Sequence, residues 1–247
     1  MGAHWDGRVG LPDPRRGRCT CGGTLQDGIG AVIPPNIAVD LNESVRDFWK
    51  RRLEVHTHDT YRGLVLAKMP EDLRTYQHII EESKPEVVLE LGSFAGGSAL
   101  WFADQLQALL GRKTMPLVVS VDISAVSFRD DRVVFINGDV KNHSTQMLVE
   151  PYLRGRRVMI SEDSQHTYES TIAALNGFAR FVSPGCWFVV EDGIVDSVEL
   201  RLPRYRGGID KAIVEFLAAD GGRRFERFGV APYGITTCIN GWLKAAP

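Results

Sequence analysis

Short apolar segments alternate with amphipathic segments from residue 86 to the end of the chain, and this alternation limits the possible folds more than any other feature of the sequence. The apolar segments are short and rich in Val, Ile and Leu, which is typical of strands buried on both faces of a parallel sheet. Between them, apolar residues recur with the spacing of a helix that packs one face on such a sheet. The pattern predicts an α/β fold with helices on both faces of the sheet.

The individual elements follow from the same pattern. The predicted strands are 87–89, 117–121, 133–136, 158–160, 187–190, 225–228 and 235–239. The predicted helices are 42–55, 72–82, 98–110, 145–153, 168–181 and 209–218. The last two strands have no helix between them, so we expect an antiparallel hairpin. This is the layout of the class I methyltransferase fold, a Rossmann-like, seven-stranded, mostly parallel sheet with a C-terminal β-hairpin and helices on both faces.

The chain has 247 residues, enough for one such domain with an extension. Residues 1–40 are rich in Gly, Pro and Arg and have no apolar periodicity, so they are predicted to be an irregular N-terminal extension. Residues 41–247 are predicted to form the methyltransferase-like domain together with its N-terminal helices. Cys19, Cys21, Cys186 and Cys238 do not form the pattern of a disulfide framework or of a paired zinc site.

Charge and hydropathy limit the partners and the compartment. The chain has 29 basic and 31 acidic residues, so it lacks the basic excess expected of a nucleic-acid-binding protein. No apolar run approaches the roughly 18 residues that span a membrane, and residues 1–18 lack the apolar stretch of a secretory signal. We expect a cytoplasmic protein with no nucleic-acid or membrane partner.

A glycine-rich segment, ELGSFAGGS at 90–98, joins the first predicted strand to the next helix. Glycines at such a turn allow a cofactor to approach the backbone closely. A P-loop requires Lys after Gly97, where this chain has Ser98, and residues Ser93 and Phe94 interrupt a dinucleotide fingerprint. An acid-x-Gly turn for S-adenosylmethionine remains, because Glu90 suits the cationic sulfonium and amino groups of that cofactor. The alternative is a tight turn that binds nothing.

Acidic residues also end the next two predicted strands. Asp122 follows the second strand, where a carboxylate accepts hydrogen bonds from ribose hydroxyls, and Asp139 follows the third, where the adenine would lie. Either acid alone could be a surface or capping residue. An ordered series at successive strand ends favours a ligand site, because open α/β sheets bind ligands there. The predicted cofactor-binding residues are Glu90, Gly92, Ser93, Gly96, Ser98, Asp122 and Asp139.

Three further carboxylates follow the fourth and fifth strands. Asp163 comes after the fourth strand, and Glu191 and Asp192 come after the fifth. Carboxylates that converge on one point repel one another unless a positive charge lies among them, and oxygen ligands suit Mg²⁺ or another divalent cation. We therefore predict that Asp163, Glu191 and Asp192 bind a metal that orients an acceptor diol and lowers the pKa of the attacking hydroxyl. Glu162 is the alternative to Asp163.

His166 lies three residues after Asp163, at the start of the next predicted helix. A neutral imidazole suits the removal of a hydroxyl proton, so His166 is the predicted base, and Asp163 and His166 together are the predicted catalytic residues. A histidine at this position could instead cap the helix or pack against it.

The chain resembles the cephalosporin hydroxylase/rhamnosyl O-methyltransferase family of Mg²⁺-dependent methyltransferases over roughly residues 55–245. The matching segments are TYRG at 60–63, KMPEDL at 68–73, KP at 84–85, ELG at 90–92, GGS at 96–98, DSQHT at 163–167, SPG at 183–185, VED at 190–192, IT at 235–236 and NGWL at 240–243. Glu162 departs from the apolar or small residue more usual in the family.

The resemblance implies that S-adenosylmethionine binds around residues 90–98 and Asp122, and that Asp163, Glu191 and Asp192 bind the metal. It implies that His166 is the base. It also implies a small-molecule acceptor, namely a deoxysugar such as rhamnose, free as a nucleotide-sugar or carried by a natural product, and a homo-oligomeric protein. The chain lacks a 2-His-1-carboxylate set and a haem or flavin motif, so oxygen chemistry has little support.

Two other functions stay open on the sequence. One is methyl transfer to a phenol or catechol, which would use a similar metal–diol geometry. The other is a non-catalytic partner of an oxygenase that only binds S-adenosylmethionine, although the presence of every predicted catalytic residue speaks against it. In addition, Arg201, Arg204 and Arg206 lie in a long connection after the fifth strand, and they could hold the diphosphate of a nucleotide-sugar or form a solvated basic loop.

Overall fold

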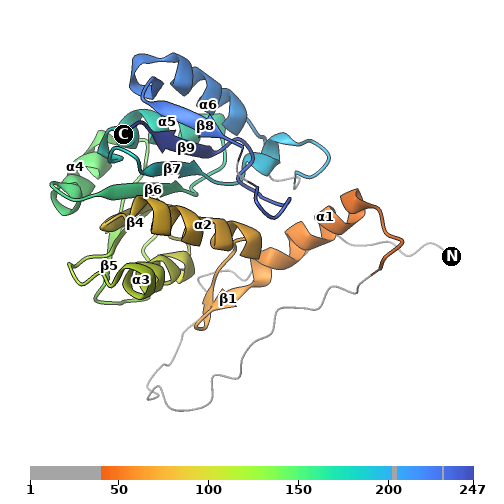
Figure 1. Ribbon diagram of the computed structural model, residues 1–247, viewed down its shortest axis with the longest axis horizontal. Coiled ribbons are helices and arrows are strands. Elements are labelled where there is room, and N and C mark those ends of the chain that lie inside the picture. Colours follow the sequence, from red (N-terminus) through yellow and green to blue (C-terminus); the bar gives the residue numbers. More distant parts are fainter. Residues whose placement is uncertain (1–39, 202–204, 230) are drawn as a thin grey trace, which may run out of the picture. The chain divides into compact units, whose positions relative to one another are not determined.

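The structure is a computed structural model, and it describes residues 40–201, 205–229 and 231–247. Seven strands form one sheet with the order β5-β4-β3-β6-β7-β9-β8 (Figure 1). Their bounds are β3 (Val87–Leu91), β4 (Val118–Asp122), β5 (Val133–Asn137), β6 (Val158–Glu162), β7 (Trp187–Val190), β8 (Phe225–Phe228) and β9 (Trp242–Ala245). The strands from β5 to β7 are parallel, and β9 runs antiparallel to both β7 and β8. The predicted fold class is confirmed.

Six α-helices accompany the sheet in the described part of the chain. They are α1 (Val45–Val55), α2 (Pro70–Ser83), α3 (Gly97–Leu110), α4 (His143–Leu153), α5 (Tyr168–Phe178) and α6 (Ile209–Ala218). Successive residues of a strand point to opposite faces of the sheet, so each strand supplies two separate hydrophobic cores. Leu89 packs with residues of α4, α5 and α6, whereas its neighbour Val88 packs with residues of α2 and α3. Both faces are therefore covered by helices, as predicted.

A short hairpin that was not predicted, β1 (Thr60–Tyr61) with β2 (Leu64–Val65), lies against the start of α3. A Cβ atom at Gly97 would lie 2.1 Å from the carbonyl oxygen of Val65. The second glycine of the Gly96-Gly97 pair therefore makes room for protein backbone. Two-residue strands carry too little periodicity to be predicted from a sequence.

The second strand of the C-terminal hairpin was predicted wrongly. It was expected at 235–239, but β9 is Trp242–Ala245. The earlier segment instead bonds locally and to α2, because the N–H and hydroxyl of Thr237 both donate to Asp72 and the Cys238 N–H donates to the Thr236 hydroxyl. Such side-chain-to-backbone bonds compete with a sheet ladder. Asn240 then takes a left-handed backbone conformation with φ 61°, which ends the turn before β9.

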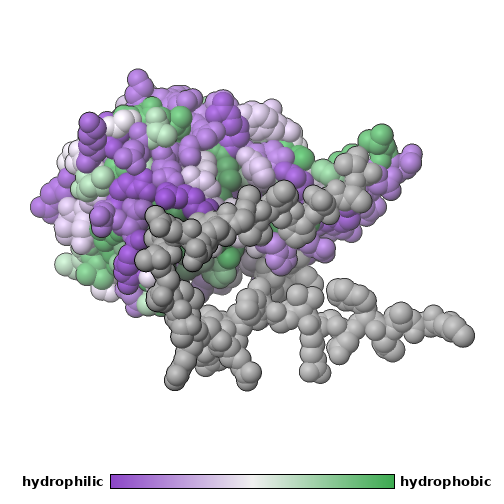
Figure 2. Space-filling model, turned by 90° about the horizontal axis from the view of Figure 1, so that it is seen from below, coloured by the Kyte–Doolittle hydropathy of each residue, from purple (hydrophilic) through white to green (hydrophobic). Residues whose placement is uncertain are grey.

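Some predictions fall on residues 1–39 and 202–204, which lie outside the described residues. They concern the N-terminal extension, Cys19, Cys21 and Arg204. Within the described residues Cys186 and Cys238 are buried free thiols. No helix of the described ranges is long and apolar enough to cross a membrane. The face drawn in Figure 2 is largely hydrophilic, with hydrophobic residues gathered in a few places.

Candidate active site

A cavity of about 250 Å³ opens at the carboxyl ends of the parallel strands. Open α/β sheets bind ligands at this edge. Of the predicted cofactor residues, five line the cavity, namely Gly92, Ser93, Ser98, Asp122 and Asp139. The structure thus brings together segments that follow three different strands. Glu90 and Gly96 are not among the lining residues.

Glu90 is fully buried next to the cavity wall. Its Oε2 accepts a hydrogen bond from Ser120, and its Oε1 has no partner among the described residues. Burial raises the pKa of Glu90 to about 7, although nearby Lys68 and the hydrogen bond from Ser120 oppose the shift. Lys68 and Ser98 both line the cavity, so an unsatisfied carboxylate oxygen lies just behind its wall.

Asp122 shapes the glycine-rich turn. Its Oδ2 accepts hydrogen bonds from the N–H groups of Ser93 at 3.0 Å and Phe94 at 2.9 Å, and its Oδ1 accepts from Ser124 at 2.8 Å. The carboxylate therefore holds the turn and faces the cavity at the same time. Asp139 is held similarly, because its Oδ1 accepts a hydrogen bond from the N–H of Lys141 at 2.9 Å.

Gly92 is required because the backbone of Asp163 passes directly against it. Its φ is 110°, and a Cβ atom there would lie 2.0 Å from the carbonyl oxygen of Asp163. The N–H of Asp163 donates to the Leu91 carbonyl at 2.7 Å. The glycine thus permits the chain after β6 to pass directly against the chain after β3, and this contact positions Asp163.

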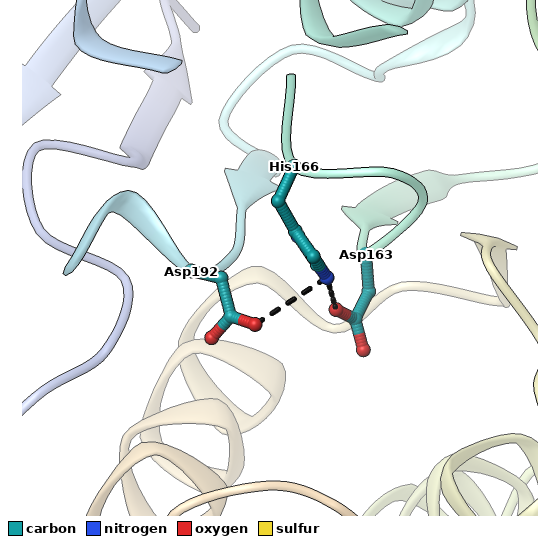
Figure 3. A group of neighbouring side chains, drawn as sticks. All are labelled: Asp163, His166 and Asp192. Carbon is teal, nitrogen blue, oxygen red and sulfur yellow. Dashed lines mark ion pairs between the residues drawn. The ribbon is translucent and has the colours of Figure 1, made fainter. Parts of the chain in front are cut away.

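Asp163, His166 and Asp192 converge beside the cavity (Figure 3). Nε2 of His166 lies 3.6 Å from Oδ1 of Asp163 and 3.4 Å from Oδ2 of Asp192. One ligand atom of each residue lies within 4.8 Å of the others, which is close enough to hold one metal ion. The two carboxylates are partly exposed, at 22% and 25% of the side chain, while His166 is buried.

The chain conformation presents His166 to the carboxylates. Its φ of 52° is left-handed, which is unusual for a residue other than glycine and turns the chain sharply before α5. Burial lowers the pKa of His166, but Asp192, Asp163 and two further carboxylates outweigh burial, so that the pKa is raised overall. Its Nδ1 has no partner among the described residues. Its ring meets the ring of Tyr205 edge-on, with centroids 5.3 Å apart.

Glu191 lies outside this group of three. Its Oε1 accepts hydrogen bonds from Lys68 at 2.6 Å, Tyr76 at 2.8 Å and Ser161 at 2.5 Å. Glu191 was predicted to bind the metal, and one of its two carboxylate oxygens already accepts three hydrogen bonds. Its neighbour Asp192 turns away in a left-handed conformation, with φ 54°, toward His166.

Lys68 is the functional residue that the sequence reasoning missed. Its ammonium bridges Glu191 and Asp163, at 2.9 Å from Oδ2 of the latter. Burial alone would lower the pKa of Lys68, but Asp163, Glu191 and Glu90 raise it well above its ordinary value, so the side chain stays charged. The signal was present in the sequence as a lysine within the matched motif at 68–73, but its partners are 95 and 123 residues away.

The donor set fits a divalent cation. Lys68 supplies one positive charge against Asp163, Glu191 and Asp192, and like charges at this spacing favour a further cation among them. Two partly exposed aspartates suit Mg²⁺, which keeps several water or substrate ligands. Glu162, the alternative ligand, is fully buried and bonds through Oε1 to Ser164. Glu162 is not part of the converging group.

Residues 53–246 match the protein family described as rhamnosyl O-methyltransferase/CmcI. The rhamnosyl O-methyltransferase of Mycobacterium leprae is 28% identical over 195 residues, which is 74% of this chain and 82% of that protein. The rhamnosyl O-methyltransferase of Mycobacterium tuberculosis is 28% identical over 166 residues, covering 64% of this chain and 66% of that protein.

Solved structures share the fold. A structure of CmcI with Mg and SAM superposes with a TM-score of 0.59 at 19% identity, covering 87% of this chain and 90% of that one. A structure of MycE, a methyltransferase from the mycinamycin biosynthetic pathway, with Mg, SAH and mycinamycin VI has a TM-score of 0.50 at 16% identity, and covers 70% of this chain and 47% of that one.

Proposed function

This chain belongs to the rhamnosyl O-methyltransferase/CmcI family and is an S-adenosylmethionine-dependent O-methyltransferase, and we propose that it methylates a hydroxyl of a deoxysugar such as rhamnose. The acceptor is a free nucleotide-sugar or a sugar carried by a natural product. We further propose that a divalent cation orients two neighbouring hydroxyls of the sugar and that His166 is the base.

The observation that carries the proposal is the position of Asp163. This residue lines the cofactor cavity and also belongs to the converging group with His166 and Asp192. A methyl donor in the cavity and an acceptor at the group would therefore meet at one point. Holding two reactants in this way is a large part of catalysis in a group transfer.

In the cavity, the proposed contacts follow from charge. The unpartnered Oε1 of Glu90, behind the cavity wall, would attract the ammonium or sulfonium of S-adenosylmethionine by its charge, and Asp122, in the wall, suits its ribose hydroxyls. Asp139, at the end of the third parallel strand, suits the adenine. Ser93 and Ser98 supply hydroxyls on the same wall, while Gly92 and Gly96 fix the turn.

Asp163, Glu191 and Asp192 would hold the metal. When bound, a divalent cation lowers the pKa of a coordinated hydroxyl and fixes the orientation of a diol. Glu191 would bind while Lys68, Tyr76 and Ser161 keep it in place. Side chains that form hydrogen bonds to a metal-binding carboxylate in this way fix its orientation.

In the proposed reaction, Nε2 of His166 removes the proton of the acceptor hydroxyl. The oxygen forms a bond to the methyl carbon as the bond between that carbon and sulfur breaks, which leaves S-adenosylhomocysteine and a methyl ether. The sulfur keeps the electron pair of the broken bond, and the imidazolium later gives its proton to water. Asp163 and Asp192 lie 3.6 and 3.4 Å from Nε2 and would orient the imidazole toward the acceptor.

The test is methyl transfer from S-adenosylmethionine to a panel of rhamnosides, other deoxysugar glycosides and nucleotide-sugars, with Mg²⁺ or with EDTA. Mass spectrometry would follow the gain of one methyl group. We expect a methylated sugar that requires the metal and that is lost in Asp163→Asn. Transfer that persists in EDTA would contradict the metal-assisted mechanism.

Two other outcomes point to the alternatives. Transfer only to catechols or other phenols would place the chain among phenol methyltransferases. Cofactor binding with no S-adenosylhomocysteine formed on any acceptor would favour the non-catalytic partner of an oxygenase. Nucleotide-sugars and simple glycosides in the same panel also test the diphosphate hypothesis, because Arg201, Arg204 and Arg206 would favour only the former.

A further inference from the structure

A second, smaller cavity of about 40 Å³ has Asp192 of the Asp163–His166–Asp192 group in its wall. Its walls come from the end of α1, the short 3₁₀ helix η1 (His56–His58) that follows, the 3₁₀ helix η3 (Gly193–Asp196) after β7, and residues 200, 201 and 205. Asp192 lines this cavity, whereas Asp163 lines the cofactor cavity. The Asp163–His166–Asp192 group therefore contributes one carboxylate to each of the two cavities.

Methyl transfer requires separate places for donor and acceptor, because the attacking oxygen and the departing sulfur lie on opposite sides of the methyl carbon. Two cavities that each contain one carboxylate of the group could supply these two places. Tyr205 lines the smaller cavity and contacts the ring of His166, with centroids 5.3 Å apart. The proposed base therefore lies next to a residue of the cavity wall.

The chemistry of the walls is divided. Leu53, Ile194 and Val195 are at most 5% exposed, belong to the hydrophobic core and bring no polar side-chain atom to the cavity. The polar side chains of the wall belong to His56, Thr57, Asp192, Arg201 and Tyr205. Burial lowers the pKa of His56, which keeps its imidazole neutral, and its Nδ1 has no partner among the described residues.

A 6-deoxyhexose is divided in the same way. It carries hydroxyls on C2, C3 and C4, and a methyl group on C5 replaces the hydroxymethyl group of a hexose. The smaller cavity has room for only a few water molecules, which suits a methyl group better than a solvated hydroxymethyl group. A hydroxyl placed against Leu53 and Val195 would lose its hydrogen bonds to water and gain none.

We propose that the smaller cavity is an acceptor subsite whose apolar wall, Leu53, Ile194, Val195 and Leu200, receives the C5 methyl group of a 6-deoxyhexose. The hydroxyls of the sugar then face Asp192 and His166. The assignment rests on the proposed sugar methyl transfer. It makes this apolar wall the element that distinguishes a deoxysugar from the corresponding hexose.

The experiment compares p-nitrophenyl α-L-rhamnopyranoside with p-nitrophenyl α-L-mannopyranoside, which differ only by the hydroxyl on C6. We expect a higher kcat/KM for the rhamnoside, by up to about a hundredfold, the order by which an apolar pocket rejects an added hydroxyl. Val195→Thr keeps the shape of the side chain and adds a hydrogen-bonding group, so it should narrow the ratio by about tenfold.

Val182→Thr is the matched control, because Val182 is equally buried, at 2% against 3% for Val195, and lines neither cavity. It should leave the ratio unchanged, and both variants should bind S-adenosylmethionine as the wild type does. Equal kcat/KM for the two sugars, or a ratio that Val195→Thr does not alter, would overturn the subsite while the proposed function stands. No transfer to either sugar by protein that binds the cofactor would count against the proposed function itself and remove the subsite with it.

Discussion

Nζ of Lys68 lies 2.6 Å from Oε1 of Glu191, and both side chains are almost completely buried beside the carboxylates of the site. The pair joins the segment just before α2 to the residue just after β7, at a sequence distance of 123 residues. A buried pair of this kind is weak evidence for stability as such, but loss of one partner leaves an uncompensated charge. Burial raises the pKa of Glu191 and the Lys68 ammonium opposes that rise, and the pair holds the carboxylate in place without a metal.

Replacement of Lys68 by Met should destabilise the protein markedly in metal-free buffer. The variant keeps the apolar stem but leaves Asp163 and Glu191 without their cation. We expect the free energy of unfolding to fall by about 3–5 kcal/mol. Urea denaturation in EDTA measures this loss, and Mg²⁺ should restore more stability to the variant than to the wild type. Lys211→Met, at an exposed ion pair, should cost less than about 0.5 kcal/mol, and a similarly small cost at Lys68 would refute the argument.

Replacement of His166 by Gln should remove catalysis and leave cofactor binding intact. Loss of a general base lowers kcat by about 10²- to 10⁴-fold. Because Nε2 lies near two carboxylates, His166 could instead ligate the metal, and the concentration of Mg²⁺ needed for half-maximal activity distinguishes the two roles. A base leaves that concentration unchanged, whereas a ligand raises it. His143→Gln, at an exposed position on α4, is the control.

Affinity for S-adenosylmethionine should increase with pH between 6 and 8. The pKa of Glu90 is raised to about 7 by burial, so its carboxylate is mostly protonated at pH 6 and mostly ionised at pH 8. Only the ionised form attracts a cationic cofactor, which predicts a Kd about tenfold weaker at pH 6 than at pH 8. Titration calorimetry at several pH values measures the trend. Glu90→Gln should bind weakly with little dependence on pH, and a variant that keeps the full trend would show that another group is responsible.

The sequence predicted the parallel strands well because each is a buried apolar run whose neighbours are also buried. It predicted the edge of the sheet where the acids meet, because strand direction alone brings Asp122, Asp163 and Asp192 to one side. It missed Lys68, whose role depends on partners far away in the chain. It misplaced the last strand because Thr237 forms hydrogen bonds to Asp72 of α2. Long-range polar contacts of this kind leave no periodic pattern.

Asp72 should make stability fall as pH rises from about 4 to 6. Burial raises its pKa from 3.8 to about 6, so the folded protein holds this proton more tightly than the unfolded chain, and stability decreases until the group is ionised in both states. Above pH 6, this effect lowers the free energy of unfolding by about 2–3 kcal/mol compared with its value at low pH. Asp72→Asn keeps an acceptor for Thr237 and removes the titration. Its stability relative to wild type should therefore rise over that interval.

Urea denaturation of wild type and Asp72→Asn at pH 4.5, 5.5 and 7 measures this difference. Other groups that titrate in the same interval are present in both proteins, so their effects cancel in the difference between the two free energies of unfolding. Asp220→Asn is the control, because Asp220 is 90% exposed in its side chain. A constant difference between Asp72→Asn and wild type across the three pH values would show that the burial of Asp72 does not control its ionisation.

Gly92 and Gly63 provide a matched test of how Asp163 is positioned. Both have positive φ, at 110° and 84°, so alanine is strained at either, by about 1–2 kcal/mol. At Gly63 nothing lies within 4 Å of the added Cβ, whereas at Gly92 the Cβ would lie 2.0 Å from the Asp163 carbonyl oxygen. Gly92→Ala must therefore also displace the chain that carries Asp163, at a further cost of about 1–3 kcal/mol.

Gly63→Ala should accordingly lower the free energy of unfolding modestly and leave kcat near that of the wild type. Gly92→Ala should lower stability more and should also raise the Mg²⁺ concentration needed for activity, because Asp163 no longer faces Asp192 and His166 correctly. Thermal unfolding with increasing Mg²⁺ separates these effects without turnover, since a displaced Asp163 weakens the stabilisation by the metal. Equal stabilisation of both variants by Mg²⁺ would mean that the contact with Gly92 does not position the metal-binding carboxylate.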